Sequence, residues 1–243
     1  MPKDEIERQF SGVMGKDYEI HNLICPNAVE MRSRIGLLVA SFDSSHRSGP
    51  VSVVEIGCGS GWATVPILES REDLRVVAID NEPTMLSQAE TTLANWLDTG
   101  RISLIEADAV SAVAEMPSES VDIVASVYVI HNLPKSYRSS LIREVFRVLR
   151  PNGLFLNGDR YALDDIHAHT EVMQREARHY IKTLSSLGRY DLLEEWITHL
   201  FDDENPDRIM RETTAISEMK DVGFRDIKIL FRDEIDALVH AMK

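Results

Sequence analysis

Apolar and polar residues alternate in blocks through the middle of the chain. Two continuous apolar runs rich in β-branched residues, at 51–56 and 74–79, are typical of strands buried on both faces. Further strands are predicted at 101–107, 121–129 and 154–158, with helical segments between successive strands. This order of elements predicts a doubly wound, mostly parallel sheet with right-handed crossovers.

Two local signals suggest where elements begin and end. Pro83 suits the first turn of a helix, which we expect to continue to near Gly100. The sequence Arg-Pro-Asn-Gly at 150–153 predicts a turn that ends one helix and leads into the fifth strand.

The carboxyl-terminal part of the chain follows a different pattern. Strands are expected at 224–231 and at 238–242, and the link between them is only a few residues long. Because so short a link leaves no room for a crossover helix, the two strands should form an antiparallel hairpin. The predicted fold is therefore α/β: a Rossmann-like, mostly parallel seven-stranded sheet with an antiparallel carboxyl-terminal hairpin and helical caps.

We expect a single domain over residues 1–243. Residues 1–45 look helical, with Pro26 opening a helix that runs through Leu38. The amino-terminal segment and an insert should both cap the carboxyl edge of the sheet, where open α/β folds bind ligands. The expected parts are an amino-terminal cap (1–45), a cofactor-binding core (51–159), a helical insert (160–208), and a final helix with the hairpin (209–243).

Composition narrows the range of partners. The chain has 26 Lys and Arg against 40 Asp and Glu, a formal net charge of −14, which argues against a nucleic-acid substrate. It has no apolar run long enough to span a membrane and no apolar stretch of signal-peptide type at its start. Its two cysteines, Cys25 and Cys58, favour a reducing cytoplasm over a disulfide scaffold. The sequence does not indicate an oligomeric state.

The stretch VVEIGCGSGWAT places three glycines directly after the first predicted strand. In a dinucleotide-binding GxGxxG fingerprint the third glycine would stand at position 62, which is Trp62 here. The observed pattern is GxGxG, made by Gly57, Gly59 and Gly61 and preceded by Glu55. Glycines let a ligand approach the backbone closely. The spacing therefore favours an adenosine-containing ligand other than NAD.

Acidic residues follow the next two predicted strands. Asp80, at the end of the second, can accept hydrogen bonds from both hydroxyls of a ribose. Asp108, after the third, is placed to accept from an adenine amino group, with Met85 and Ala109 packed against the purine faces. A helix cap and a loop residue are the ordinary alternatives for the two aspartates. The joint placement at successive strand ends favours a cofactor site.

The ordered segments EIGCGSG, AIDNEPTML, EADAV, VDIVASVYVIHNLP and VLRPNGLFL resemble the class I S-adenosylmethionine-dependent methyltransferases. The resemblance covers residues 51–160 and extends in topology to the carboxyl-terminal hairpin. It implies S-adenosyl-L-methionine as cofactor and methyl transfer to a small-molecule acceptor. For Tyr18, a plain core role is an equal alternative to cofactor contact. The predicted cofactor-binding residues are Tyr18, Glu55, Gly57, Cys58, Gly59, Gly61, Asp80, Asn81, Met85, Asp108, Ala109, Ser126 and Val127.

The acceptor side is expected from the segments after strands four and five and from the caps. His131 follows strand four, and because imidazoles ordinarily titrate near neutral pH, it is the candidate catalytic residue. Capping the next helix is the alternative role for His131. Arg160 could pair with an acceptor carboxylate. The predicted substrate-binding residues are Tyr128, Asn132, Arg160, Tyr161 and His199.

No metal site is expected from the sequence. His167 and His169 lie near two aspartates, but in a helix a two-residue spacing points the two rings in different directions. Ligands on one helix that share an ion need a separation of three or four residues.

Two alternative functions remain. The insert and the later DVGF segment resemble the enzymes that make carboxy-S-adenosylmethionine for tRNA modification. Those enzymes carry an arginine in the helical insert, and the comparable stretch here, EEWITHLFDD, has none. The second alternative is a non-catalytic, cofactor-binding partner protein.

Overall fold

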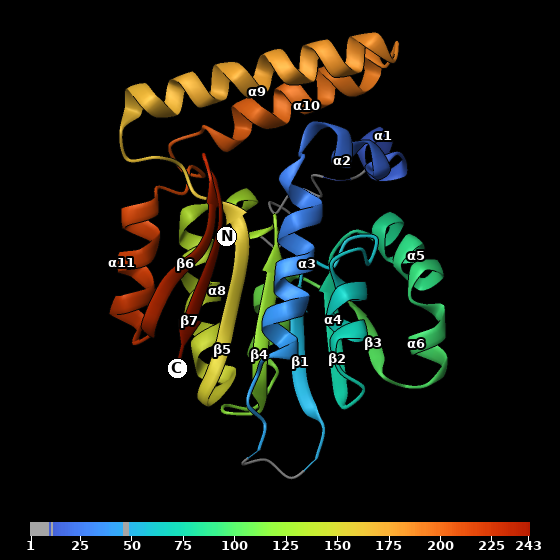
Figure 1. Cartoon of the computed structure of the whole chain (residues 1–243), viewed down its shortest axis with the longest axis vertical. Helices are drawn as coiled ribbons and strands as arrows, with labels where there is room; N and C mark the ends of the chain where they lie inside the picture. The colour runs from blue at the N-terminus through green and yellow to red at the C-terminus, as the bar shows by residue number, and fades with distance from the viewer. Residues whose placement is uncertain (1–9, 11, 46–48) are drawn as a thin grey trace.

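The computed structural model describes residues 10, 12–45 and 49–243, and a seven-stranded sheet forms its centre (Figure 1). The strand order is β3-β2-β1-β4-β5-β7-β6. Strands β1 to β5 run parallel, and β7 is antiparallel to both of its neighbours. This confirms the predicted fold. The strands are β1 (Val51–Ile56), β2 (Leu74–Asp80), β3 (Ile102–Glu106), β4 (Val121–Val127), β5 (Leu149–Arg160), β6 (Arg225–Asp233) and β7 (Asp236–Met242).

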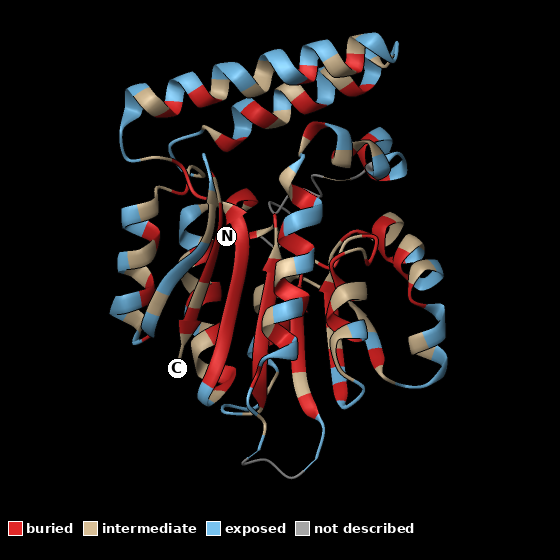
Figure 2. Ribbon diagram, viewed as in Figure 1, coloured by how far each residue is buried: buried red, intermediate tan, exposed pale blue. Residues whose placement is uncertain are grey.

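Helices cover both faces of the sheet, and the central strands β1, β4 and β5 are mostly buried, whereas the edge strand β6 is largely exposed (Figure 2). Alternate residues of a strand point to opposite faces. Val51 and Val53 of β1 accordingly join one apolar cluster, whereas Val54 and Ile56 join the other. The first cluster is completed by α3 (Asn27–Ala40), α4 (Thr64–Ser70), α5 (Pro83–Thr92) and α6 (Ala94–Asp98), and the second by α7 (Ala109–Ala114), α8 (Lys135–Val148) and α11 (Glu212–Val222).

A third layer lies across the carboxyl ends of the parallel strands. Two long helices, α9 (Ile166–Ser186) and α10 (Tyr190–Asp203), form a hairpin above that edge (Figure 1). The short elements α1 (Gly12–Lys16), η1 (Tyr18–Ile20) and α2 (His21–Ile24) lie beneath this helical hairpin. The two caps share a small apolar core made of Met14, Ile24, Tyr180, Leu184, Leu192, Trp196 and Leu200. None of the helices in the described ranges is both long and apolar enough to cross a bilayer.

Two local predictions were wrong. The helix that begins at Pro83 is interrupted at Leu93, where the backbone leaves helical geometry (φ −105°, ψ 10°). The side chain of Leu93 is fully buried and lies beneath Gly61. Residues 150–153 do not form a turn ahead of the fifth strand, because β5 already begins at Leu149. They lie within β5, where its pairing with β4 shifts register. Asn152 adopts a positive φ of 63° there, and its N–H bonds the carbonyl of Lys243.

The close contact between Gly61 and Leu93 generates a stability prediction. Gly61 has a φ of 87°, and a Cβ added to it would lie 2.9 Å from Leu93 Cδ1. Gly100 also has a positive φ, 67°, but a Cβ there would meet nothing within 4 Å. We expect Gly100→Ala to lower the free energy of unfolding by about 1–2 kcal/mol, the cost of the left-handed conformation. Gly61→Ala should lose that amount plus roughly 1–3 kcal/mol of overpacking. Urea unfolding of both variants measures the difference, and equal losses would contradict the packing role.

Candidate functional site

A cleft opens where the carboxyl ends of β1, β2, β3 and β4 meet. It holds about 910 Å³ of space, part of it open to solvent, and loops from these four strands line it. We call it the donor cleft.

Two glycines of the GxGxG loop form the floor of the donor cleft. Gly57 and Gly59 both have positive φ, 67° and 54°. A Cβ on Gly57 would collide with Val129, and one on Gly59 would lie 3.1 Å from Met85 Cε. Bare backbone is therefore required at both positions. Gly61 does not line the cleft, because it lies over Leu93.

Asp80 connects the glycine loop to the start of α5. Its Oδ2 accepts a hydrogen bond from the Gly59 N–H at 2.8 Å, and its Oδ1 accepts one from the Glu82 N–H at 2.9 Å. Burial raises the pKa of Asp80, and these backbone donors oppose the shift. Since a carboxylate has about four acceptor positions, this side chain can still accept bonds from a ligand in the cleft.

Asp108 lines the opposite wall of the donor cleft. One of its oxygens caps α7 by accepting from the Ser111 N–H at 2.9 Å, and the other accepts a hydrogen bond from the hydroxyl of Tyr137. Tyr137 comes from α8 and was not among the predicted residues. Its ring extends the cleft wall beside Asp108.

Eight of the predicted cofactor residues line the donor cleft. Four others, Glu55, Cys58, Gly61 and Ser126, lie behind its surface. Burial raises the pKa of the Glu55 carboxyl to about 8, although the Thr64 hydroxyl acts to lower it. This carboxyl is therefore mainly protonated at neutral pH. The side chain of Tyr18 lies outside the described part of the chain. The eight lining residues are Gly57, Gly59, Asp80, Asn81, Met85, Asp108, Ala109 and Val127.

A second, smaller cavity of about 350 Å³ lies between the sheet edge and the α9/α10 hairpin. We call it the inner cavity. It shares Phe10, Tyr128 and Asn132 with the donor cleft, so the two spaces adjoin. Five predicted residues meet at this cavity although they come from separate segments: Tyr128, His131, Asn132, Arg160 and His199.

Tyr161 is the predicted substrate residue that lies elsewhere. Its side chain is fully buried in the core on the α7, α8 and α11 face, and its hydroxyl accepts a hydrogen bond from Asn157 Nδ2 at 2.8 Å.

His131 is held by a buried carboxylate that the sequence reading did not single out. It lies in η2 (Ile130–Asn132), and its Nδ1 bonds Asp159 Oδ1. The other oxygen of Asp159 accepts the N–H groups of Ile130 at 3.0 Å and of His131 at 3.2 Å. The second ring nitrogen of His131, Nε2, lies 3.7 Å from Asp203 Oδ2 at the end of α10. Asp159 thus fixes both the backbone and the ring orientation of His131.

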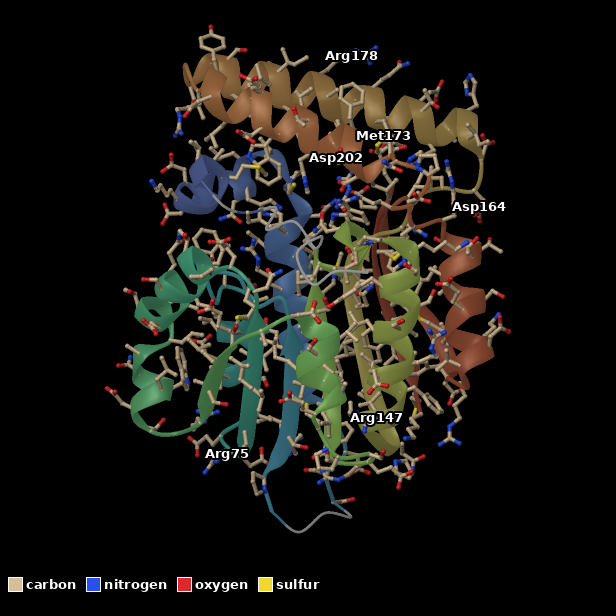
Figure 3. All side chains as sticks on the ribbon, turned by 180° about the vertical axis from the view of Figure 1, so that it is seen from behind. Arg75, Arg147, Asp164, Met173, Arg178 and Asp202 are labelled. Atoms are coloured by element: carbon tan, nitrogen blue, oxygen red, sulfur yellow. The ribbon has the colours of Figure 1, made fainter. Side chains whose placement is uncertain are left out.

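Arg160 links the sheet to the helical hairpin. It forms an ion pair with Glu176 of α9 at 2.8 Å, and its Nε lies 3.6 Å from Asp203 Oδ2. Burial works against its charge, but the neighbouring carboxylates, led by Glu176, hold the pKa of Arg160 well above its ordinary value. Its guanidinium also lies 3.8 Å from the sulfur of Met173. Met173 points from the side of α9 that is nearer the sheet, whereas Arg178 points from the opposite side (Figure 3). This guanidinium is already paired within the protein.

Comparison with known proteins connects this geometry to a family. Residues 53–153 match the family model described as a methyltransferase domain. A carboxy-S-adenosyl-L-methionine synthase of Vibrio cholerae is 23% identical over 146 residues. That alignment covers 59% of this chain and 56% of the relative, so the chain matches only about half the length of this relative.

Two solved structures have a similar fold. A SAM-dependent methyltransferase from Archaeoglobus fulgidus superposes with a TM-score of 0.62 at 13% identity, over 93% of this chain and 99% of that one. An O-methyltransferase family protein from Burkholderia thailandensis gives a TM-score of 0.63 at 14% identity, over 97% and 61% of the two chains. Residues 53–153 thus resemble a methyltransferase domain, and the chain as a whole shares the fold of these two solved methyltransferases.

Proposed function

We propose that this protein transfers the methyl group of S-adenosylmethionine to a small molecule bound in the inner cavity. The observation that carries the proposal is that a donor cleft and an inner cavity adjoin at Phe10, Tyr128 and Asn132. Residues of the α9/α10 hairpin form part of the wall of the inner cavity, and its size below that of the donor cleft supports a small acceptor.

The donor cleft fits the cofactor on several independent features. Gly57 and Gly59 present backbone without side chains, which allows close approach of a ligand. The carboxylates of Asp80 and Asp108 are acceptors for the hydroxyl and amino donors of an adenosine. Met85 and Ala109 supply apolar surface between them.

When bound, S-adenosylmethionine would supply an electrophilic methyl group, which an acceptor lone pair would take in line as the bond from the methyl carbon to the sulfur breaks. The protein must hold the acceptor in line with that methyl group and exclude water, and orientation of this kind can lower a barrier by about 7–11 kcal/mol in favourable cases. Tyr128 and Asn132, at the boundary of the two spaces, are placed for this alignment. Residues of α9 and α10 form part of the wall of the inner cavity.

We assign His131 to activation of the acceptor. It is 6% exposed, it lines the inner cavity, and Asp159 holds its Nδ1. The remaining ring nitrogen, Nε2, is thereby directed to the acceptor side. Asp159 is the corresponding positioning residue, since it acts on the acceptor only through His131.

Synthesis of a carboxylated cofactor is the second candidate. It is favoured by the similarity to the Vibrio cholerae carboxy-S-adenosyl-L-methionine synthase. The lack of an arginine in EEWITHLFDD argues against it, as does the pairing of Arg160 with Glu176. Mass spectrometry of nucleosides formed from S-adenosylmethionine separates the two functions, because methyl transfer yields the demethylated cofactor and the alternative yields a carboxylated one.

The donor assignment predicts a loss of cofactor affinity in Asp80→Asn. The substitution removes the charge from two acceptor oxygens, and hydrogen bonds to charged groups contribute about 1.5–3 kcal/mol each. We therefore expect calorimetry to show S-adenosylmethionine binding weakened roughly 10- to 100-fold. Asp98→Asn, at the exposed end of α6, is the matched control and should bind normally. Unchanged affinity in Asp80→Asn would contradict the assignment.

The acceptor assignment predicts where a labelled methyl group appears. The protein is incubated with methyl-labelled S-adenosylmethionine and a cell extract divided into small-molecule, protein and RNA fractions. We expect label in the small-molecule fraction only, with Asp80→Asn showing strongly reduced transfer. Label confined to RNA or protein would overturn the choice of acceptor class, and label in none of the fractions would overturn methyl transfer.

The role of His131 predicts a separation of turnover from cofactor binding. His131→Ala should slow label transfer by about 10²–10⁴-fold, the range for loss of a group that assists proton removal. Its affinity for S-adenosylmethionine should remain close to that of the parent, because His131 does not line the donor cleft. Asp159→Asn should show a smaller loss in the same direction. Normal turnover in His131→Ala would leave this residue only a structural role.

A further inference from the structure

Three potential metal ligands from two distant segments meet in the inner cavity. His131, His199 and Asp203 each offer one atom, and these atoms all lie within 4.8 Å of one another. Asp203 Oδ2 is 3.7 Å from His131 Nε2, and Asp203 Oδ1 is 3.9 Å from His199 Nε2. Two ligands of a single tetrahedral ion with bonds of about 2.0–2.1 Å lie roughly 3.4 Å apart. Small side-chain adjustments would therefore bring these atoms to bonding distance.

Each of the three side chains is prepared for this role. Asp203 is 7% exposed, and its Oδ1 accepts no hydrogen bond from the described residues. The Nδ1 of His131 is bonded to Asp159, which leaves Nε2 as the ligand atom, as carboxylate–histidine pairs do around bound metals. His199 and Asp203 are four residues apart on α10, so they share one face of the helix.

The charge around these residues favours a divalent cation. Asp159 and Asp203 lie beside His131, and Arg160 pairs with Glu176 and Asp203. Among the described residues of this group, three carboxyl side chains stand beside a single guanidinium. Buried acidic groups of this kind are commonly paired or bound to a metal.

We infer that His131, His199 and Asp203 form a binding site for a divalent transition-metal ion of the zinc type. Two imidazole nitrogens and one carboxylate oxygen suit Zn²⁺ or Fe²⁺ better than Mg²⁺ or Ca²⁺, which prefer oxygen ligands. Three protein ligands leave at least one coordination position open, and the site lines the inner cavity. His131 would then activate the acceptor by holding the ion, which lowers the pKa of a hydroxyl or thiol bound to it. This use of the ion rests on the proposed function; occupancy of the site does not.

The test measures metal binding without any acceptor. The full-length protein is treated with EDTA, dialysed, and titrated with Zn²⁺ by calorimetry and with Co²⁺ by visible absorption. We expect one saturable site and Co²⁺ bands typical of low coordination number. His199→Ala and Asp203→Ala should weaken Zn²⁺ binding by more than about 100-fold, since even partners outside the ligand set change metal affinity 10- to 100-fold.

The control uses a similar pair on the neighbouring helix. His167 and Glu171 of α9 are also four residues apart, but the His167 side chain is 86% exposed. His167→Ala should leave Zn²⁺ binding unchanged. S-adenosylmethionine affinity, measured in every variant, shows that the donor cleft is still folded.

Two results would overturn the site. Absence of a saturable Zn²⁺ isotherm in the parent protein would mean that His131, His199 and Asp203 do not form a metal site. Equal Zn²⁺ binding in the parent, His199→Ala and Asp203→Ala would mean adventitious binding at exposed histidines. Neither result bears on methyl transfer, which the labelled-fraction experiment tests separately.

Discussion

The arrangement of the acceptor side depends on the buried carboxylate of Asp159. This side chain is inaccessible to solvent, and its two oxygens accept from five donors: the backbone N–H groups of Ile130, His131 and Arg160, the His131 ring, and the Asn157 amide. A carboxylate so buried is tolerated only when its acceptor positions are filled. The end of β5 is thereby fastened to the segment after β4, and His131 and Arg160 are directed to the inner cavity.

The meeting of several predicted residues at the donor cleft could be anticipated from sequence because their placement is local. Gly57 directly follows β1, Asp80 ends β2, and Asp108 lies two residues after β3. Parallel strands bring their carboxyl ends to one edge, so a correct strand prediction already places these residues together. The same reasoning could not separate residues that line the cleft from those behind it. Gly61 looks equivalent to Gly59 in the motif, yet its bare backbone accommodates Leu93.

The acceptor side resisted prediction because its partners are far apart in the chain. Asp203 lies at the end of α10, and its contact with His131 depends on how the α9/α10 hairpin settles over the sheet. No local pattern encodes that docking. One signal is nevertheless present in the sequence: His199 and Asp203 have the four-residue spacing that places two side chains on one helical face, unlike the two-residue spacing of His167 and His169.

The two halves of the site are held by different kinds of interaction. The residues of the donor cleft are positioned by the backbone at the strand ends. The apolar packing on both faces of the sheet holds these strands in place. The inner cavity depends on the ion pairs of Arg160 with Glu176 and Asp203, which join β5 to α9 and α10. Buried ion pairs contribute little net stability once desolvation is included, but they fix which groups face each other. The residues that face the inner cavity from the hairpin are therefore positioned by these ion pairs, whereas the donor cleft is positioned by the sheet itself.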